Sequence, residues 1–258
     1  MPFNIAAFTY IGTQRPTQQD AMLVNEILLT EGKIELTNQL EIKCFVADGV
    51  GGSADGAFAS QFVLDKIRET SFVEYWKFVE QLREINKYLI SQNNEGKGNT
   101  ATTLSGVIFR DESFHFFHAG DSEIYLLRAE RVLPLSVSQC KQVDEQFKSA
   151  NPGYSLEQLH EKARNTITSY LGGYSPQLRL DADWKRKIEL PQIKGVQPGD
   201  VILICSDGLF KSVSQTDIKK KLYRENKSIF ETSDELRTLS EKHGAEDNVS
   251  MILIEFFE

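Results

Sequence analysis

The sequence is poor in several features that would point to particular classes of protein. Its 258 residues include only 3 cysteines and 4 histidines, and their positions show none of the spacing of a structural zinc site. Cys44 and Cys205 lie inside apolar, strand-like runs, where a free thiol usually packs as a small hydrophobic side chain. Because three cysteines cannot all pair with one another, we expect a reducing, cytoplasmic location.

Long apolar runs and blocks of basic residues are lacking too. No stretch approaches the roughly 18 apolar residues of a membrane span, and the first residues do not have the pattern of a secretory signal, so we expect no membrane association. Lys and Arg number 29 against 37 Asp and Glu, which gives a formal net charge of −8. This acidic balance disfavours binding to nucleic acid, which relies on basic charge.

No internal repeat or low-complexity linker divides the sequence, which predicts a single domain over residues 1–258. Strand patterns rich in Val, Ile and Phe recur, and several are separated by turns short enough for antiparallel hairpins. The predicted strands are Ala21–Leu29, Ile42–Ala47, Thr103–Phe109, Ser113–His118, Glu123–Leu127, Val201–Cys205 and Val249–Phe256.

Helical patterns fall into two groups. The first runs from about Ala57 to Ile90, and its aromatic stripe is read as core packing rather than as a binding groove. The second is C-terminal and comprises Ser214–Tyr223 and Thr232–Lys242, the latter opening on a Thr232-x-x-Glu235 capping box. Many antiparallel strands with helices in separate pairs predict an α+β fold built in layers.

The segment 139–165 has the weakest strand signal and the most polar residues. A short helix is expected after the capping-box pattern Ser155-x-x-Gln158. We interpret the whole segment as an insertion or a flap.

Four segments share one design, an apolar strand with an aspartate at its end: Asp48, Asp121, Asp207 and Asp247. For any one of them an ordinary turn is the simpler explanation. Four aspartates that converge would repel one another unless cations lay between them. Mg²⁺ and Mn²⁺ prefer such oxygen ligands, and a pair of them can activate water for a displacement at phosphorus. Both a phosphatase and a nuclease could use this site, so the ligands alone leave the substrate open.

Arg15 narrows that choice. It lies just before Asp20 on a segment that leads into a strand. A guanidinium group binds the oxygens of a phosphoryl group at two points, which favours a phosphate substrate. A surface arginine without a role is the alternative.

These segments resemble, in order and almost from end to end of the chain, those of the PP2C-type (PPM) phosphatases. The matching stretches are Arg15-x-x-Gln18-Gln19-Asp20-Ala21, Asp48-Gly49-Val50-Gly51-Gly52, Gly98–Thr103, Gly120-Asp121-Ser122, Thr168–Gly173, Ser206-Asp207-Gly208-Leu209 and Asp247-Asn248.

The resemblance implies a four-layer α-β-β-α sandwich, in which helix pairs flank two antiparallel sheets and a metal cleft lies at one edge. It implies hydrolysis of phosphoserine and phosphothreonine in protein substrates by a metal-bridging hydroxide, without a phosphoenzyme. Such an enzyme would act in signalling, opposing a serine/threonine kinase, and we expect a monomer. The compact length resembles bacterial members of the family.

The resemblance also assigns metal ligands for Mn²⁺ or Mg²⁺. Asp48 would bridge two metal ions, with the Gly49 carbonyl on one of them and Asp207 and Asp247 on the other. Asp121 together with Asp207 would form the third, weaker site described for bacterial-type members.

Two further residues receive roles in the same way. Asp20 would lie at or behind the second metal, mostly through water. Arg15 would hold the substrate phosphate. The predicted catalytic residues are therefore Arg15, Asp48 and Asp207.

The sequence departs from the family pattern at four positions. Gln18 stands where Asn is usual, Glu123 where an arginine commonly follows Gly-Asp-Ser, and Lys211 where an acid is usual. Val50 stands where many eukaryotic members have a histidine proposed as a general acid. The charge changes at Lys211 and Glu123 motivate an alternative, a catalytically degenerate PP2C-like fold that acts as a regulatory binding module.

Overall fold

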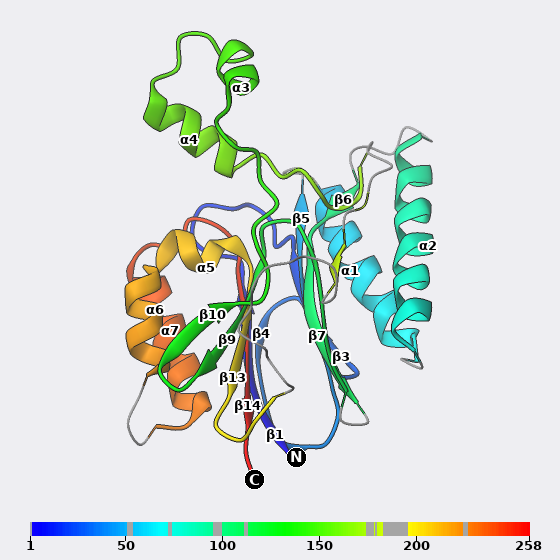
Figure 1. Cartoon of the computed structure of the whole chain (residues 1–258), viewed down its shortest axis with the longest axis vertical. Coiled ribbons are helices and arrows are strands. Elements are labelled where there is room, and N and C mark those ends of the chain that lie inside the picture. Colours follow the sequence, from blue (N-terminus) through cyan, green and yellow to red (C-terminus); the bar gives the residue numbers. More distant parts are fainter. Residues whose placement is uncertain are drawn as a thin grey trace.

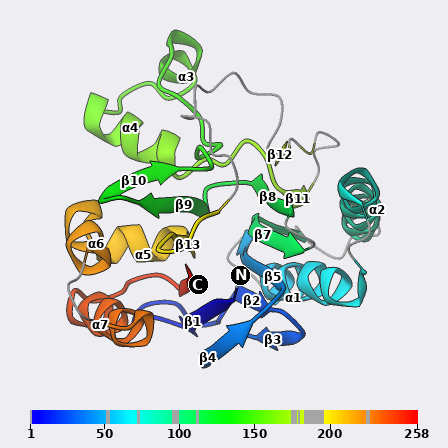
Figure 2. The same ribbon diagram turned by 60° about the horizontal axis from the view of Figure 1, so that its bottom comes forward.

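The strands form two sheets that pack face to face, with helices on both outer faces (Figures 1 and 2). The structure, a computed structural model, describes residues 2–50, 54–71, 74–94, 100–110, 113–173, 178, 180–182, 196–223 and 227–258. Within these residues every strand pairing is antiparallel, as the short turns predicted.

The first sheet has 6 strands in the order β10-β9-β13-β14-β1-β4. Three of these strands were not predicted from the sequence: β1, β4 and β10. The bounds are β1 Phe3–Tyr10, β4 Gly32–Gln39, β9 Glu123–Arg128, β10 Arg131–Pro134, β13 Val201–Cys205 and β14 Val249–Phe256.

The second sheet has 8 strands, in the order β11-β6-β5-β7-β8-β12, with β2 paired to β5 and β3 paired to β2. The single strand predicted over Ala21–Leu29 is wrong, because the chain turns at Asn25, whose φ of 55° is left-handed. The bounds are β2 Asp20–Val24, β3 Ile27–Leu29, β5 Ile42–Val50, β6 Ala101–Thr102, β7 Leu104–Arg110, β8 Ser113–Ala119, β11 Leu171–Gly172 and β12 Asp181–Ala182.

The two helical layers cover opposite faces of this sandwich (Figure 2). Helices α1 (Ala54–Glu69) and α2 (Tyr75–Asn94) cover the second sheet, as the first helical pattern predicted. The first sheet is covered by three helices rather than a pair: α5 (Asp207–Ser212), α6 (Gln215–Leu222) and α7 (Ile229–Lys242).

The predicted start of α7 is wrong by one turn. Its N-cap is Ser228, and the capping box pairs Ser228 with Glu231 rather than Thr232 with Glu235. Thr232 lies inside the helix and donates from Oγ1 to the carbonyl of Ser228. Glu235 instead forms an ion pair with Lys221.

The core has three layers of apolar side chains, one between the sheets and one beneath each helical layer. Strand β1 contributes to two of them: Ile5 and Ala7 face the second sheet, whereas Ala6 and Phe8 face the helices. A strand buried on both faces reads as a continuous apolar run. Cys44 and Cys205 are buried in these layers, which agrees with their interpretation as packing residues.

The 139–165 segment contains α3 (Glu145–Ser149) and α4 (Leu156–Arg164), and both stand clear of one end of the sandwich (Figure 1). The capping box between Ser155 and Gln158 at the start of α4 is confirmed. Phe147, Leu159 and Ala163 form a small apolar cluster within the segment. None of the helices in the described ranges is long and apolar enough to span a membrane.

Candidate active site

Strand register explains why the aspartates meet at one edge of the sandwich. In the second sheet Asp20 on β2 lies directly opposite Asp48 on β5. In the first sheet Cys205 on β13 lies opposite both Glu123 on β9 and Met251 on β14. Antiparallel neighbours therefore bring the turn before β9, the residues after β13 and the turn before β14 to the same edge. These three places hold Asp121, Asp207 and Asp247.

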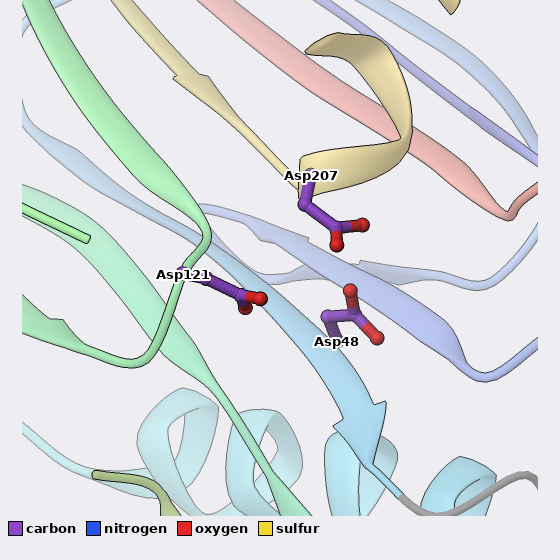
Figure 3. Close-up of side chains that lie close together, drawn as sticks. All are labelled: Asp48, Asp121 and Asp207. Carbon is purple, nitrogen blue, oxygen red and sulfur yellow. The ribbon is translucent and has the colours of Figure 1, made fainter. Parts of the chain in front are cut away.

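Three of the predicted aspartates form a close cluster. Asp48, Asp121 and Asp207 each offer a carboxylate oxygen, and these oxygens all lie within 4.8 Å of one another. Figure 3 shows the three side chains converging from β5, from the turn after β8 and from the first residue of α5. We call this set the carboxylate cluster.

The carboxylate cluster is crowded with negative charge. Burial, followed by the charges of neighbouring aspartates, raises the pKa of Asp48 well above its usual range. Burial and the charge of Asp207 raise the pKa of Asp121 to about 7. One oxygen of Asp121 and one of Asp207, Oδ1 in both, are buried without a hydrogen-bond partner within the described residues. Buried polar atoms are normally satisfied, so these oxygens point to a ligand.

The donor set fits a hard divalent cation. All three groups supply carboxylate oxygen, which Mg²⁺ and Mn²⁺ prefer. Such a cation would compensate their negative charge and bind the unpartnered oxygens of Asp121 and Asp207. The residues present therefore fit the Mn²⁺ or Mg²⁺ that the sequence predicted.

Asp247 lies outside the carboxylate cluster and is held by cationic side chains. Arg15 donates from Nε to Oδ1 at 2.6 Å and from Nη2 to Oδ2 at 2.8 Å. Lys211 donates to Oδ2 at 2.8 Å. Burial acts to raise the pKa of Asp247, but the hydrogen bonds from Arg15 and Lys211 outweigh it and lower that pKa.

Asp20 lies behind the carboxylate cluster. Its Oδ2 accepts hydrogen bonds of 2.8 Å from the hydroxyl of Ser206, which follows β13, and from that of Ser250 on β14. Its side chain is fully buried, and burial is the main cause that raises its pKa to about 7. Asp20 therefore ties β2 to β14 and to Ser206, the residue that precedes Asp207.

Threonines and serines fix the backbone around the carboxylate cluster. The Asp48 carbonyl accepts from the backbone N–H of Thr103 at 2.8 Å and from the Thr102 hydroxyl at 3.0 Å. Thr103 Oγ1 accepts from the Asp48 N–H at 3.0 Å and bonds to Ser122 Oγ at 2.9 Å. Reading the sequence by motif located these residues but did not reveal this supporting role.

Gly49 lies where the chain approaches α1 closely. A Cβ atom at Gly49 would lie 2.3 Å from the carbonyl oxygen of Gly56, so only glycine fits. Of the family-like stretches, Gly51, Gly52 and Gly98 lie outside the described residues.

Asn248 holds the loop that carries Arg15. Its Oδ1 accepts from the backbone N–H of Gln19, and its Nδ2 donates to the carbonyls of Ile11 and Thr17. Gln18, which departs from the family pattern, donates from Nε2 to Thr9 and accepts from the backbone N–H of Asp20. The side chain of Gln18, one carbon longer than that of Asn, thus makes local hydrogen bonds that fix the loop carrying Arg15.

Glu123 and the histidines do not take part in the carboxylate cluster. Glu123 accepts from the hydroxyl of Tyr125. His118 bonds through Nδ1 to Ser105 and through Nε2 to the carbonyl of Val137. Its buried ring links β7 and β8 to the segment after β10, which is a structural role.

Comparison with known proteins agrees with this geometry. The family model described as Protein phosphatase 2C matches residues 31–253. The serine/threonine phosphatase stp of Listeria monocytogenes is 26% identical over 222 residues, which cover 81% of this chain and 82% of that protein. A putative protein phosphatase 2C-type of Streptococcus pyogenes is 29% identical over 262 residues, 97% of this chain and 96% of its own length.

A solved structure shows the same fold. The catalytic domain of the serine/threonine protein phosphatase PstP, in complex with 2 manganese ions, aligns over 100% of this chain and 99% of its own with a TM-score of 0.71 and 23% identity. The predicted α-β-β-α sandwich is thereby confirmed. Together with the family match, this shows that the chain belongs to the protein phosphatase 2C family, and the predicted class of enzyme, a metal-dependent protein serine/threonine phosphatase, is confirmed.

Proposed function

We propose that the protein hydrolyses phosphoserine and phosphothreonine esters in protein substrates at the carboxylate cluster. The observation that carries this proposal is the convergence of Asp48, Asp121 and Asp207, two of which, Asp121 and Asp207, have a buried oxygen without a partner within the described residues. An intact set of this kind favours an active enzyme over the degenerate binding module.

The carboxylate cluster would hold Mn²⁺ or Mg²⁺, with Asp247 and the Gly49 carbonyl as further ligands. When bound, such ions neutralise the carboxylates and activate water for attack on phosphorus. Asp20 would support the site from behind, because it holds Ser206 next to Asp207.

Arg15 would orient the phosphoryl group. Two of its N–H donors engage Asp247, and a guanidinium group has five. Its side chain is 43% exposed at the mouth of the site, so the remaining donors can reach an incoming substrate.

Direct attack by water is favoured over a covalent intermediate. The thiol nearest to the carboxylate cluster is Cys140, whose Sγ lies 3.9 Å from Asp121 Oδ2. Burial and then the neighbouring acidic groups raise its pKa, so it stays protonated and is a poor nucleophile. Val50 supplies no proton to the leaving group, and His118 is engaged elsewhere. Water would therefore protonate the serine or threonine oxygen.

A phosphopeptide assay tests this function. Turnover should require Mn²⁺ or Mg²⁺ and should fall by at least about 100-fold in Asp48→Ala and Asp207→Asn. Asp217→Asn is a matched control, since Asp217 lies on the surface of α6 and pairs with Lys220. Turnover that survives EDTA, or an unaffected Asp207→Asn variant, would contradict the proposal.

We also propose that the 139–165 segment selects substrates. Gln139, the first residue of the segment, is bound to Gly120, which precedes Asp121. The backbone N–H of Gln139 donates to the Gly120 carbonyl at 2.7 Å, and the Gln139 side-chain oxygen accepts from the Gly120 N–H at 3.1 Å. Replacing residues 143–164 with a short Gly/Ser linker should leave p-nitrophenyl phosphate hydrolysis within about threefold and change the ranking of phosphopeptides by about tenfold. An unchanged ranking would contradict this role.

In the cell the protein would oppose a serine/threonine kinase, as a monomer in the cytoplasm. The buried, unpaired Cys44 and Cys205 are consistent with a reducing compartment. Size-exclusion chromatography with light scattering measures the mass in solution and so tests whether the protein is a monomer.

A further inference from the structure

Lys211 lies between two predicted metal ligands. It is one turn after Asp207 on α5, and its Nζ lies 2.5 Å from Asp207 Oδ2 and 2.8 Å from Asp247 Oδ2. A single ammonium group thus bridges two carboxylates that come from distant parts of the chain. A divalent cation shared by the same two oxygens would need that position.

We propose that Lys211 is a built-in counter-ion that competes with divalent metal for Asp207 and Asp247. This inference rests on the metal site of the proposed function and goes further by dividing that site into two unequal halves. In the half at Asp48 and Asp121 the carboxylates bind metal directly. In the half at Asp247 an entering metal ion must first displace the ammonium group of Lys211.

The hydrogen bonds of Asp207 and Asp247 show this division. Oδ1 of Asp207 is buried and unpartnered within the described residues, whereas its Oδ2 is paired with Lys211. Both oxygens of Asp247 are engaged, Oδ1 by Arg15 and by the Asn248 N–H at 2.9 Å, and Oδ2 by Arg15 and Lys211. Within the described residues the unpartnered oxygen of this pair is therefore Oδ1 of Asp207, whereas the Oδ2 atoms of Asp207 and Asp247 are both neutralised by Lys211.

The position of Lys211 allows displacement. Its side chain is 42% exposed, whereas those of Asp207 and Asp247 are 23% and 15% exposed. A lysine has a flexible stem of four carbons, so the ammonium group can move into solvent while the carboxylates stay in place. The cation–carboxylate attraction lost in that movement reduces the affinity for metal at this half.

The same contact should act in opposite directions on the two states of the protein. Without metal, Lys211 reduces the repulsion between Asp207 and Asp247 and stabilises the fold. With metal, its charge opposes the bound cations. Removing the charge of Lys211 should therefore lower the stability of the metal-free protein and raise its affinity for metal.

The test is a titration with Mn²⁺ alone, followed by calorimetry and by the loss of the free-ion EPR signal. Lys211→Met should tighten the weakest resolved Mn²⁺ site by at least about tenfold, which corresponds to about 1.4 kcal/mol. It should also lower the melting temperature in EDTA. Lys211→Arg, which keeps the charge, should retain weak binding, and Lys220→Met is the control because Lys220 pairs with Asp217 on the surface of α6.

The outcomes separate this inference from the proposed function. If Lys211→Met binds Mn²⁺ as the wild-type protein does, while Asp48→Ala abolishes binding, the metal site stands and the role of Lys211 is overturned. If the wild-type protein binds no Mn²⁺, both proposals fail. Should Lys211→Met not fold, Lys211→Gln replaces it with the same expected result.

Discussion

Asp20 and Asp48 face each other in the ladder between β2 and β5, yet their carboxylates serve different parts of the molecule. Asp48 belongs to the carboxylate cluster, whereas Asp20 accepts hydrogen bonds from Ser206, which follows β13, and from Ser250 on β14. Sequence motifs place both residues at the metal site. Asp20 Oδ2 makes the bonds that support the site, whereas its Oδ1 is buried without a partner within the described residues, as are Asp121 Oδ1 and Asp207 Oδ1.

Replacing Asp20 should separate its hydrogen bonds from its charge. Asp20→Ala leaves the hydroxyls of Ser206 and Ser250 without this acceptor, whereas Asp20→Asn keeps an acceptor and removes the buried charge. We expect Asp20→Ala to be less stable than Asp20→Asn by about 1–3 kcal/mol in urea unfolding. Equal stability of the two variants would show that the contacts between the sheets contribute little.

The stability of the metal-free protein should fall as the pH rises. The folded-state pKa is raised to about 7 for Asp20 and Asp121, and the pKa of Asp48 is raised well above its usual range. A carboxyl group with a raised pKa stabilises the fold below its unfolded pKa, about 4, and loses that contribution as the pH rises through the folded pKa. Asp247, whose pKa is lowered, acts in the opposite direction at low pH.

Melting temperatures in EDTA should therefore decline between about pH 5 and about pH 8, and excess Mn²⁺ should reverse most of that decline. Asp121→Asn should flatten the profile, because it removes one of the carboxyl groups whose pKa is raised. If the melting temperature of the wild-type protein in EDTA does not change with pH, repulsion among the carboxylates does not reduce its stability.

Gly12 should tolerate no side chain. Its φ is +78°, and a Cβ atom there would lie 2.1 Å from the carbonyl oxygen of Asp247. Gly32 is a matched control, with a φ of +106° and open space around the added atom. Gly12→Ala should reduce the free energy of unfolding by at least about 2 kcal/mol more than Gly32→Ala, and it should weaken Mn²⁺ binding because Asp247 is pushed away. Similar losses in the two variants would contradict the close packing of Gly12 on Asp247.

Much of the second sheet and the identity of the acidic residues could be predicted from the sequence, because strand-end aspartates stand out against apolar runs. Strand β1 was missed even though it lies inside the first sheet. Its side chains are buried on both faces, so no alternation of apolar and polar residues marks it. The edge strand β4 was missed as well, although its exposure does alternate.

The arrangement within the site was harder to predict. Sequence order predicted that Asp48, Asp121, Asp207 and Asp247 share one site, but the division between the carboxylate cluster and the cation-bound Asp247 depends on three-dimensional contacts. Lys211 appeared in the sequence only as a departure from a pattern. Its bridging position depends on α5 beginning at Asp207, which places the two residues one helical turn apart.

The side-chain amide of Asn248 couples the position of Arg15 to that of Asp247. Because Asn248 follows Asp247 directly and bonds to the backbone on both sides of Arg15, the loop that carries Arg15 and the turn that carries Asp247 share one anchor. A substitution that shifts the backbone around Arg15 should therefore also move Asp247. Drift in this enzyme should therefore be slow at residues 11–19 and 247–248, and new specificity should arise elsewhere on the surface.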